Sequence, residues 1–237
     1  MSFSVIISIV GAVTTGVFSA LLLMRWRVKR RAHLLAWGLG LAFYCLGMAS
    51  QVILAQSWNA LFFRLWYWSG ALIVAPWLGQ GTVFLLVRKG NRARNLALLL
   101  AIASVIGLVW LFLTPLDATA WQPGADMTEV FKDIMPSGGV RFLAPILNIW
   151  GTVTLVGGAL YSAYLFRRKA ILPQRLTGNI LIAIGGIIPA FGGTLVLLGR
   201  TEYKYLAELV GAILIFAGYL LATSSAPQVQ KHHTAAA

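Results

Sequence analysis

Residues 58–87 read WNALFFRLWYWSGALIVAPWLGQGTVFLLV, an apolar run that exceeds the ~20 residues a helix needs to cross a ~30 Å hydrocarbon core. Arg64 lies beside the aromatic residues 66–68, a combination typical of the interface between lipid and water. Pro76 falls near the middle of the run, and Gln80 follows one turn later. The run therefore predicts a central transmembrane helix with a kink and with polar groups that need partners inside the protein.

The composition of the whole chain is that of a membrane protein. Of its 237 residues, 59% are hydrophobic and 11% are charged, and the mean hydropathy is +0.82, which lies outside the range of ordinary soluble domains. Long apolar runs predict seven spans, at residues 4–24, 34–56, 58–87, 96–114, 142–166, 176–199 and 206–223. We therefore expect an all-α bundle of seven transmembrane helices in one domain, 1–226, followed by a disordered tail at 227–237.

The basic residues predict how the chain is oriented. The net charge is +13, and most of the cations fall in three short loops, 25–31, 88–94 and 167–175. The positive-inside rule places all three loops in the cytoplasm, with the amino terminus outside and the carboxy terminus inside a bacterial cytoplasmic (inner) membrane. We expect these loops to meet anionic lipid headgroups, and we expect the bundle to associate with a membrane protein partner or a second copy rather than with nucleic acid.

The one long loop, 115–140, contains a short predicted helix. Asp126 can cap this helix, and Glu129 follows three residues later, as in a capping box. The apolar residues of the helix would share one face: Met127, Val130, Phe131 and Ile134. One interpretation is an outer lid over a cavity, and the other is a short helix that lies at the membrane interface.

An internal repeat is one interpretation of two similar strings. Residues 69–74 read SGALIV and residues 210–215 read VGAILI, which aligns Gly70 with Gly211. The same offset, within a residue, superposes the start of 34–56 on the start of 176–199. A 3+1+3 repeat, with 96–114 as the connecting helix, would explain the match. Chance similarity is the alternative, since such strings are common in membrane helices.

Several kinds of chemistry lack the residues that they need. The single cysteine, Cys45, excludes an intrachain disulfide, and the span 206–223 has no lysine to form a retinal Schiff base. The histidines, at 33, 232 and 233, fall in a loop and in the tail, where they cannot hold a haem between helices. We therefore expect no cofactor, no metal site and no catalytic set, and hence a protein that is not an enzyme.

Prolines and glycines predict hinges in two spans. Pro76 lies in 58–87, and Pro189 lies in 176–199. Two glycine pairs flank the second proline: Gly185, Gly186, Gly192 and Gly193. These residues should let the helix bend and let a neighbouring backbone approach closely.

Polar side chains that helical spacing places inside the bundle are the candidate ligand-binding residues: Tyr44, Gln51, Arg64, Gln80, Asn148, Glu208 and Tyr219. They could connect helices through hydrogen bonds of ~0.6 to 2 kcal/mol each, or they could line an outward-opening pocket for a small apolar or amphipathic molecule. Arg64 and Glu208 have matching depths, which predicts an ion pair between helices. In the alternative, Lys204 neutralises Glu208 locally and Arg64 reaches the headgroups.

Four residues of the first run are arranged as W-x-x-x-x-x-R-x-x-Y-x-x-G: Trp58, Arg64, Tyr67 and Gly70. With the string WLGQGT at 77–82 and the basic loop after the first span, they resemble a group of uncharacterised bacterial seven-helix membrane proteins. The layout is also similar to the seven-helix sensing regions of some bacterial histidine kinases, but without a kinase domain. The resemblance implies a small-ligand sensor or accessory subunit that acts through a partner. The alternative function is a passive facilitator or transporter of a solute or lipid.

Overall fold

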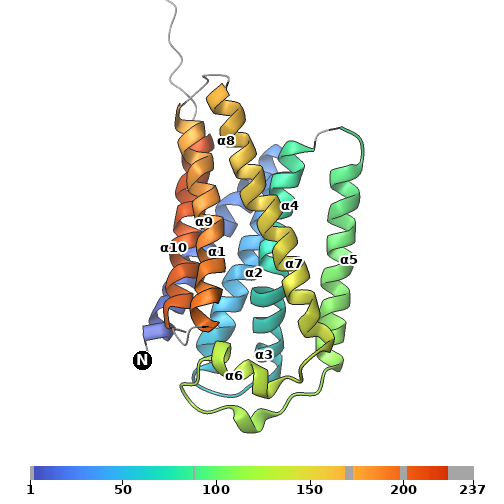
Figure 1. Cartoon of the computed structure of the whole chain (residues 1–237), viewed down its shortest axis with the longest axis vertical. Helices are drawn as coiled ribbons and strands as arrows, with labels where there is room; N and C mark the ends of the chain where they lie inside the picture. The colour runs from blue at the N-terminus through green and yellow to red at the C-terminus, as the bar shows by residue number, and fades with distance from the viewer. Residues whose placement is uncertain (1–2, 88, 169–172, 198–201, 224–237) are drawn as a thin grey trace, which may run out of the picture.

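The computed structural model describes residues 3–87, 89–168, 173–197 and 202–223, with side chains for all of these except 190, 193–197 and 202. The described residues form helices and loops, with no β-strand among them (Figure 1). The α-helices are α1 (Phe3–Lys29), α2 (Ala32–Leu54), α3 (Ala60–Trp66), α4 (Val74–Leu86), α5 (Arg92–Leu113), α6 (Met127–Ile134), α7 (Leu143–Thr152), α8 (Gly158–Arg168), α9 (Pro173–Leu197) and α10 (Glu202–Thr223). Two wide π turns, Tyr67–Ile73 and Val153–Gly157, join α3 to α4 and α7 to α8, and two 3-10 turns, Ala118–Ala120 and Gly139–Phe142, flank α6.

Six helical stretches of the described chain are long and apolar enough to cross a membrane: Phe3–Lys29, Ala32–Leu54, Ala60–Leu86, Arg92–Leu113, Gly139–Arg168 and Tyr203–Thr223. They confirm the prediction of an all-helical, multi-pass membrane protein. The remaining predicted span, 176–199, falls on α9, although its last two residues lie outside the described part of the chain. The predicted tail, 227–237, also lies outside it.

Helix α1 continues past its predicted end at residue 24 and reaches Lys29. The added residues include arginines and a lysine, which favour helix, and the helix ends where Arg30 adopts a positive φ of 49°. Arg25 is consequently part of the helix and not of a loop. At helical spacing it shares a face with Leu22, which is fully buried, and with Lys29.

The helices pack side by side, and α5 lies at one edge of the bundle (Figure 1). Helix α1 packs along α2, and α9 packs along α10, while α4 lies between α2 and the α7–α8 helix. Helix α5 contacts the rest of the bundle mainly through the α3–α4 helix and leaves most of its aliphatic surface exposed, including Leu98 and Leu99. Such a surface suits contact with lipid.

The α4 and α7 backbones meet directly where the two glycines Gly79 and Gly151 face each other. A Cβ atom on Gly151 would lie 2.6 Å from the carbonyl oxygen of Ala75, so no side chain fits there. In a π turn, each backbone N–H donates to the carbonyl oxygen five residues earlier. For Ala71 O that donor would be residue 76, but this residue is a proline and has no N–H. The Nδ2 group of Asn148 donates to Ala71 O instead, across 2.6 Å.

The glycines of α9 form a seam with α10. A Cβ atom on Gly185 would lie 2.7 Å from the carbonyl oxygen of Gly211, and one on Gly211 would lie 2.7 Å from the carbonyl oxygen of Gly185. Gly192 approaches α10 in the same way, whereas Gly186 faces Leu155 and Val156 of the π turn before α8. Helix α9 continues through Pro189. Gly193 lies outside the part of α9 whose side-chain surroundings are described.

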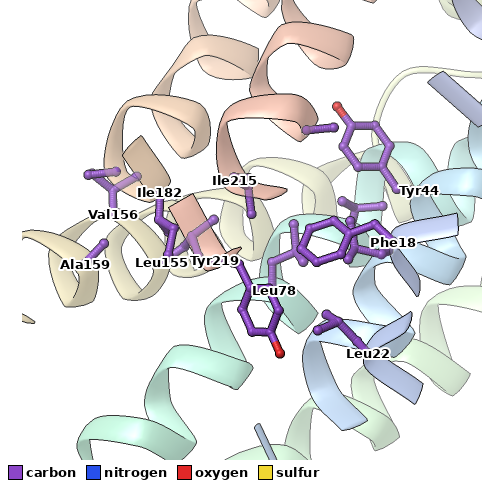
Figure 2. Packing of buried hydrophobic residues seen from close by; sticks show 14 of the residues in the cluster. Phe18, Leu22, Tyr44, Leu78, Leu155, Val156, Ala159, Ile182, Ile215 and Tyr219 are labelled. Carbon is purple, nitrogen blue, oxygen red and sulfur yellow. The ribbon is translucent and has the colours of Figure 1, made fainter. Parts of the chain in front are cut away.

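Buried residues form two apolar cores. The larger core joins α1, α2, α4, α9, α10 and the α7–α8 helix, and it includes Phe18, Leu78 and Leu155 (Figure 2). The second core lies under α6, where Met127 and Ile134 are fully buried against α3 and the π turn that follows it. Burial of these side chains fixes both the bundle and the segment that covers one of its ends.

The loop 115–140, here called the lid segment, is tied to the bundle by several hydrogen bonds. As predicted, Asp126 caps α6, because its side chain accepts the N–H of Thr128 at 2.8 Å. The hydroxyl of Tyr205 on α10 donates to Asp126 Oδ1 at 2.9 Å, and the indole N–H of Trp121 donates to Leu54 O at 2.9 Å. The lid segment therefore packs on a filled core at this end of the bundle, called the lid end below.

Candidate ligand pocket at the basic end

Charge is separated between the two ends of the bundle. The described parts of the predicted basic loops belong to the ends of α1, α2, α4, α5, α8 and α9 that lie opposite the lid segment, and we call this the basic end (Figure 1). The six acidic residues of the sequence belong to the lid segment or to the first two turns of α10, which begins at the lid end: Asp117, Asp126, Glu129, Asp133, Glu202 and Glu208. The basic end therefore carries an uncompensated positive charge.

A cavity of about 1010 Å³ opens at the basic end, between the end turns of α1, α2, α4, α8, α9 and α10. We call it the basic pocket. No carboxylate occurs among its described lining residues, whereas five basic side chains do: Arg25, Lys29, Arg31, His33 and Arg175. A pocket with this lining attracts anions and repels cations.

Two aromatic residues form the floor of the basic pocket. Arg25 Nη1 donates to the hydroxyl oxygen of Tyr219 at 2.9 Å, and the guanidinium carbon lies 5.4 Å from the centre of the Tyr219 ring. The Trp37 ring meets the Tyr219 ring edge-on, with centroids 6.0 Å apart. The indole N–H of Trp37 is fixed by donation to Leu78 O at 2.9 Å. The floor is therefore held in place by α1, α2, α4 and α10 together.

The apolar core closes the pocket below this floor. Trp37 and Tyr219 also border a gap of about 10 Å³ whose other lining residues are apolar, among them Phe18, Leu78 and Leu155 (Figure 2). A gap of this size is at the lower limit for a single water molecule and cannot pass a solute. Among the described residues, the basic pocket therefore ends at this floor as a blind cavity.

Arg175 on α9 supplies an unsatisfied donor in the pocket wall. Its guanidinium carbon lies 6.0 Å from the centre of the Phe166 ring, and its Nε atom is buried without a hydrogen-bond partner in the described structure. The Nδ2 group of Asn179 donates to Arg175 O at 2.8 Å and fixes this turn. A buried N–H without an acceptor costs about 1–3 kcal/mol, which a bound acceptor would recover.

One of the seven predicted site residues, Tyr219, lines the basic pocket. Tyr44 lies nearer the lid end, where its hydroxyl donates to the backbone oxygen of Glu208 at 3.1 Å. The Glu208 carboxylate pairs with Lys204, one turn earlier, at 3.2 Å. These residues join α2 to α10 and do not face a shared cavity with Tyr219.

Arg64 makes local contacts in place of the expected pair with Glu208. Its guanidinium group donates to the backbone oxygens of Leu111 at 3.2 Å and Thr114 at 3.3 Å, at the carboxy-terminal end of α5. Carbonyls in the last turn of a helix lack the usual i+4 donor, and Arg64 adds to the N–H of Thr114, which donates to Leu111 O at 3.3 Å. Glu208 is already paired with Lys204 within its own helix. The predicted ion pair rested on the similar depths of Arg64 and Glu208, but Arg64 contacts the end of α5 and Glu208 contacts Lys204.

The remaining candidates connect helices or lie within the core. Gln80 Nε2 donates to Ala93 O at 2.8 Å and joins α4 to α5, while Asn148 joins α7 to the first π turn. Gln51 is 1% exposed, and its Oε1 atom has no partner in the described structure. The seven residues do not line one outward-opening pocket, because the lid segment and its core fill the lid end.

The basic pocket depends on residues that the sequence indicated only as orientation signals. Arg25 and Arg175 belong to helices and line the pocket. Arg25 and Arg27 are both exposed on α1, but only Arg25 contacts Tyr219, and Arg27 does not line the pocket. The spacing of Leu22, Arg25 and Lys29 on one helical face would have been the available signal. Comparisons with protein-family models and with curated proteins find no match for this chain.

Proposed function

We propose that this protein is a non-enzymatic, seven-span protein of the bacterial cytoplasmic membrane that binds an anionic small molecule in the basic pocket. In this role it would act as a sensor or accessory subunit through a membrane partner or a second copy. The observation that carries the proposal is a blind cavity of about 1010 Å³ lined by basic side chains and by no described carboxylate. Apolar residues complete the lining, which favours a ligand that is both anionic and amphipathic.

The orientation in this proposal puts the basic end in the cytoplasm, with α9 as the seventh span and the amino terminus outside. The separation of charge between the two ends supports it. The 3+1+3 repeat stays a prediction, in which α5 would join the two three-helix units.

Cys45 is the single cysteine, so a Cys45→Ser background allows site-specific labelling of one introduced cysteine at a time. In that background, Lys89→Cys should react with a membrane-impermeant thiol reagent in inverted vesicles, and Ser137→Cys should react in intact spheroplasts. Both positions are exposed in the structure. The reverse pattern would overturn the orientation, and with it the cytoplasmic position of the pocket.

Binding can be tested with octyl phosphate, a soluble anionic amphiphile, and with octyl glucoside as its neutral counterpart. Octyl phosphate should raise the melting temperature of the purified protein in a saturable way, because a ligand that binds the folded state stabilises it. The combined Arg25→Gln and Arg175→Gln variant should lose this effect, and Arg27→Gln, on the same helix but outside the pocket, should keep it. An equal effect of octyl glucoside would contradict an anionic site.

A flux measurement separates the proposed role from a passive facilitator. The closed floor under Trp37 and Tyr219 predicts that proteoliposomes will not leak anions, and a stable partner should co-purify with the protein. Anion leak that is removed by Pro76→Ala or Pro189→Ala would instead support the facilitator, because those prolines lie in the helices that would have to bend.

A further inference from the structure

We infer that the ligand of the basic pocket is an anionic phospholipid from the leaflet that borders the basic end, with its phosphate on Arg25 and Arg175. This inference rests on the proposed function, because it names the ligand class of the same site. It follows from the depth of the pocket, the division of its walls into charged and apolar sides, and its opening towards lipid.

The floor of the pocket lies at the depth where lipid headgroups meet acyl chains. Trp37 is little more than one turn inside the start of α2 at Ala32, and Tyr219 is one turn before the end of α10 at Thr223. At a rise of 1.5 Å per residue, both residues lie about 6–8 Å below the helix ends. A cavity at this depth is continuous with the headgroup layer, where phospholipid phosphates are concentrated.

The walls of the pocket divide into a cationic side and an apolar side. Arg25 on α1 and Arg175 on α9 supply the cationic side, while Leu86 on α4 and Leu165 on α8 belong to the apolar side. A soluble metabolite would leave the leucines in contact with water or with polar groups. A phospholipid satisfies both sides, because its phosphate and its acyl chain are covalently joined.

The apolar side of the pocket reaches the lipid-facing surface of the bundle. Helix α8 contacts α4 closely at Gly158, where an added Cβ atom would lie 3.0 Å from Leu86 Cδ1. One turn nearer the basic end, Tyr161 lines the pocket and is 53% exposed. Leu160 and Tyr164 continue this exposed face of α8. The apolar side of the pocket therefore borders an exposed apolar face of α8, along which an acyl chain of the proposed lipid would lie.

In this inference, the guanidinium groups of Arg25 and Arg175 bind the phosphate. Arginine binds phosphate through paired N–H donors in a plane, and Arg175 Nε is a buried donor without a partner in the described structure. Arg25 is an exposed residue, and its guanidinium group is held against the floor by Tyr219. Lys29 and Arg31 add positive charge to the lining and increase the preference for a headgroup with a net negative charge over a zwitterionic headgroup that also contains a phosphate.

The test uses the purified full-length chain in detergent with equal amounts of phosphatidylglycerol and phosphatidylcholine, and native mass spectrometry measures the lipid that it retains. Phosphatidylglycerol should be retained in preference to phosphatidylcholine. The Arg25→Gln and Arg175→Gln variant should lower its retention by about tenfold, whereas Arg27→Gln should change it by less than about twofold.

A competition experiment on the unchanged protein keeps the test informative if the double variant does not fold. Octyl phosphate should displace the retained phosphatidylglycerol, because both place a phosphate on the same arginines. Equal retention of the two lipids, or retention that octyl phosphate does not affect, would overturn the inference.

Melting-temperature measurements with soluble phosphates distinguish the phospholipid inference from the proposed anionic site. If octyl phosphate or inorganic phosphate raises the melting temperature through Arg25 and Arg175 but phosphatidylglycerol is not retained, the phospholipid inference fails and the proposed anionic site stands. If none of these anions binds, both proposals fail.

Discussion

Arg25 on α1 lies over the aromatic ring of Tyr219 on α10 and donates from Nη1 to its hydroxyl oxygen across 2.9 Å. This contact joins helices near the two ends of the chain at the floor of the basic pocket. It also holds the guanidinium group of this exposed residue against the floor of the pocket, although a free arginine side chain would extend into water. Arg25 is therefore both a structural contact and the proposed seat for an anion.

The Arg25–Tyr219 contact should appear as a coupling energy of about 1 kcal/mol in a double-mutant cycle with Arg25→Gln and Tyr219→Phe, because the two replacements remove the same hydrogen bond. Equilibrium unfolding in detergent measures it. Arg27→Gln combined with Tyr219→Phe is the matched control and should be additive. Additivity in both cycles would show that the contact contributes nothing to stability.

The α4–α7 crossing should not tolerate a side chain at Gly151. Gly151→Ala forces its methyl group against the backbone at Ala75 and should destabilise the protein by about 1–3 kcal/mol. Gly157, in the second π turn of the same long helix, has no atom within 4 Å of an added Cβ. Gly157→Ala is therefore the control and should leave the melting temperature nearly unchanged. Similar losses in both variants would argue against the backbone contact.

The lid segment should loosen when its connection to α10 is removed. Tyr205→Phe deletes the hydroxyl that contacts Asp126 and Thr128, so we expect a loss of about 1–2 kcal/mol and faster proteolytic cleavage within 115–140. Tyr203 is on the same helix and is 44% exposed. Tyr203→Phe should leave the cleavage rate unchanged, and unchanged cleavage of Tyr205→Phe would mean that other contacts hold the segment.

Arg64 should act on the end of α5 and not on Glu208. Arg64→Gln removes donors from Leu111 O and Thr114 O and should cost about 1–3 kcal/mol. Arg64→Lys should recover little of this loss, because an ammonium group lacks the planar donor geometry. The double reversal, Arg64→Glu with Glu208→Arg, should be no more stable than the sum of its parts. If the double reversal recovers the stability that each single reversal loses, the result would instead support the predicted ion pair between Arg64 and Glu208.

Hydropathy was sufficient to predict six helices that are long and apolar enough to cross a membrane, because the length of an apolar run reflects the thickness of the bilayer. It was less informative about where each helix ends, because lysine and arginine can extend a helix beyond its apolar part. For α1 this extension determines that Arg25 faces the bundle. The kink expected at Pro76 is also different in form: the structure places a π turn just before it, and Asn148 supplies the missing donor.

The candidate site was harder to predict for a related reason. Polar residues in the middle of apolar runs are natural candidates for ligand contacts, yet inside a membrane bundle the nearest acceptors are often backbone carbonyls. Asn148 and Gln80 donate to such carbonyls. The basic pocket is instead formed where six helix ends converge, and that convergence depends on tertiary packing that no local pattern contains.

The glycine seam between α9 and α10 brings the two backbones together, since an added Cβ atom on Gly185 or on Gly211 would lie 2.7 Å from the carbonyl oxygen of the other residue. Arg175 lies on the basic-end part of this helix pair, and Tyr205 lies on its lid-end part, where its hydroxyl contacts the lid segment. If the proposed anion binds at Arg175, a shift of this closely packed pair would connect the pocket to the lid segment.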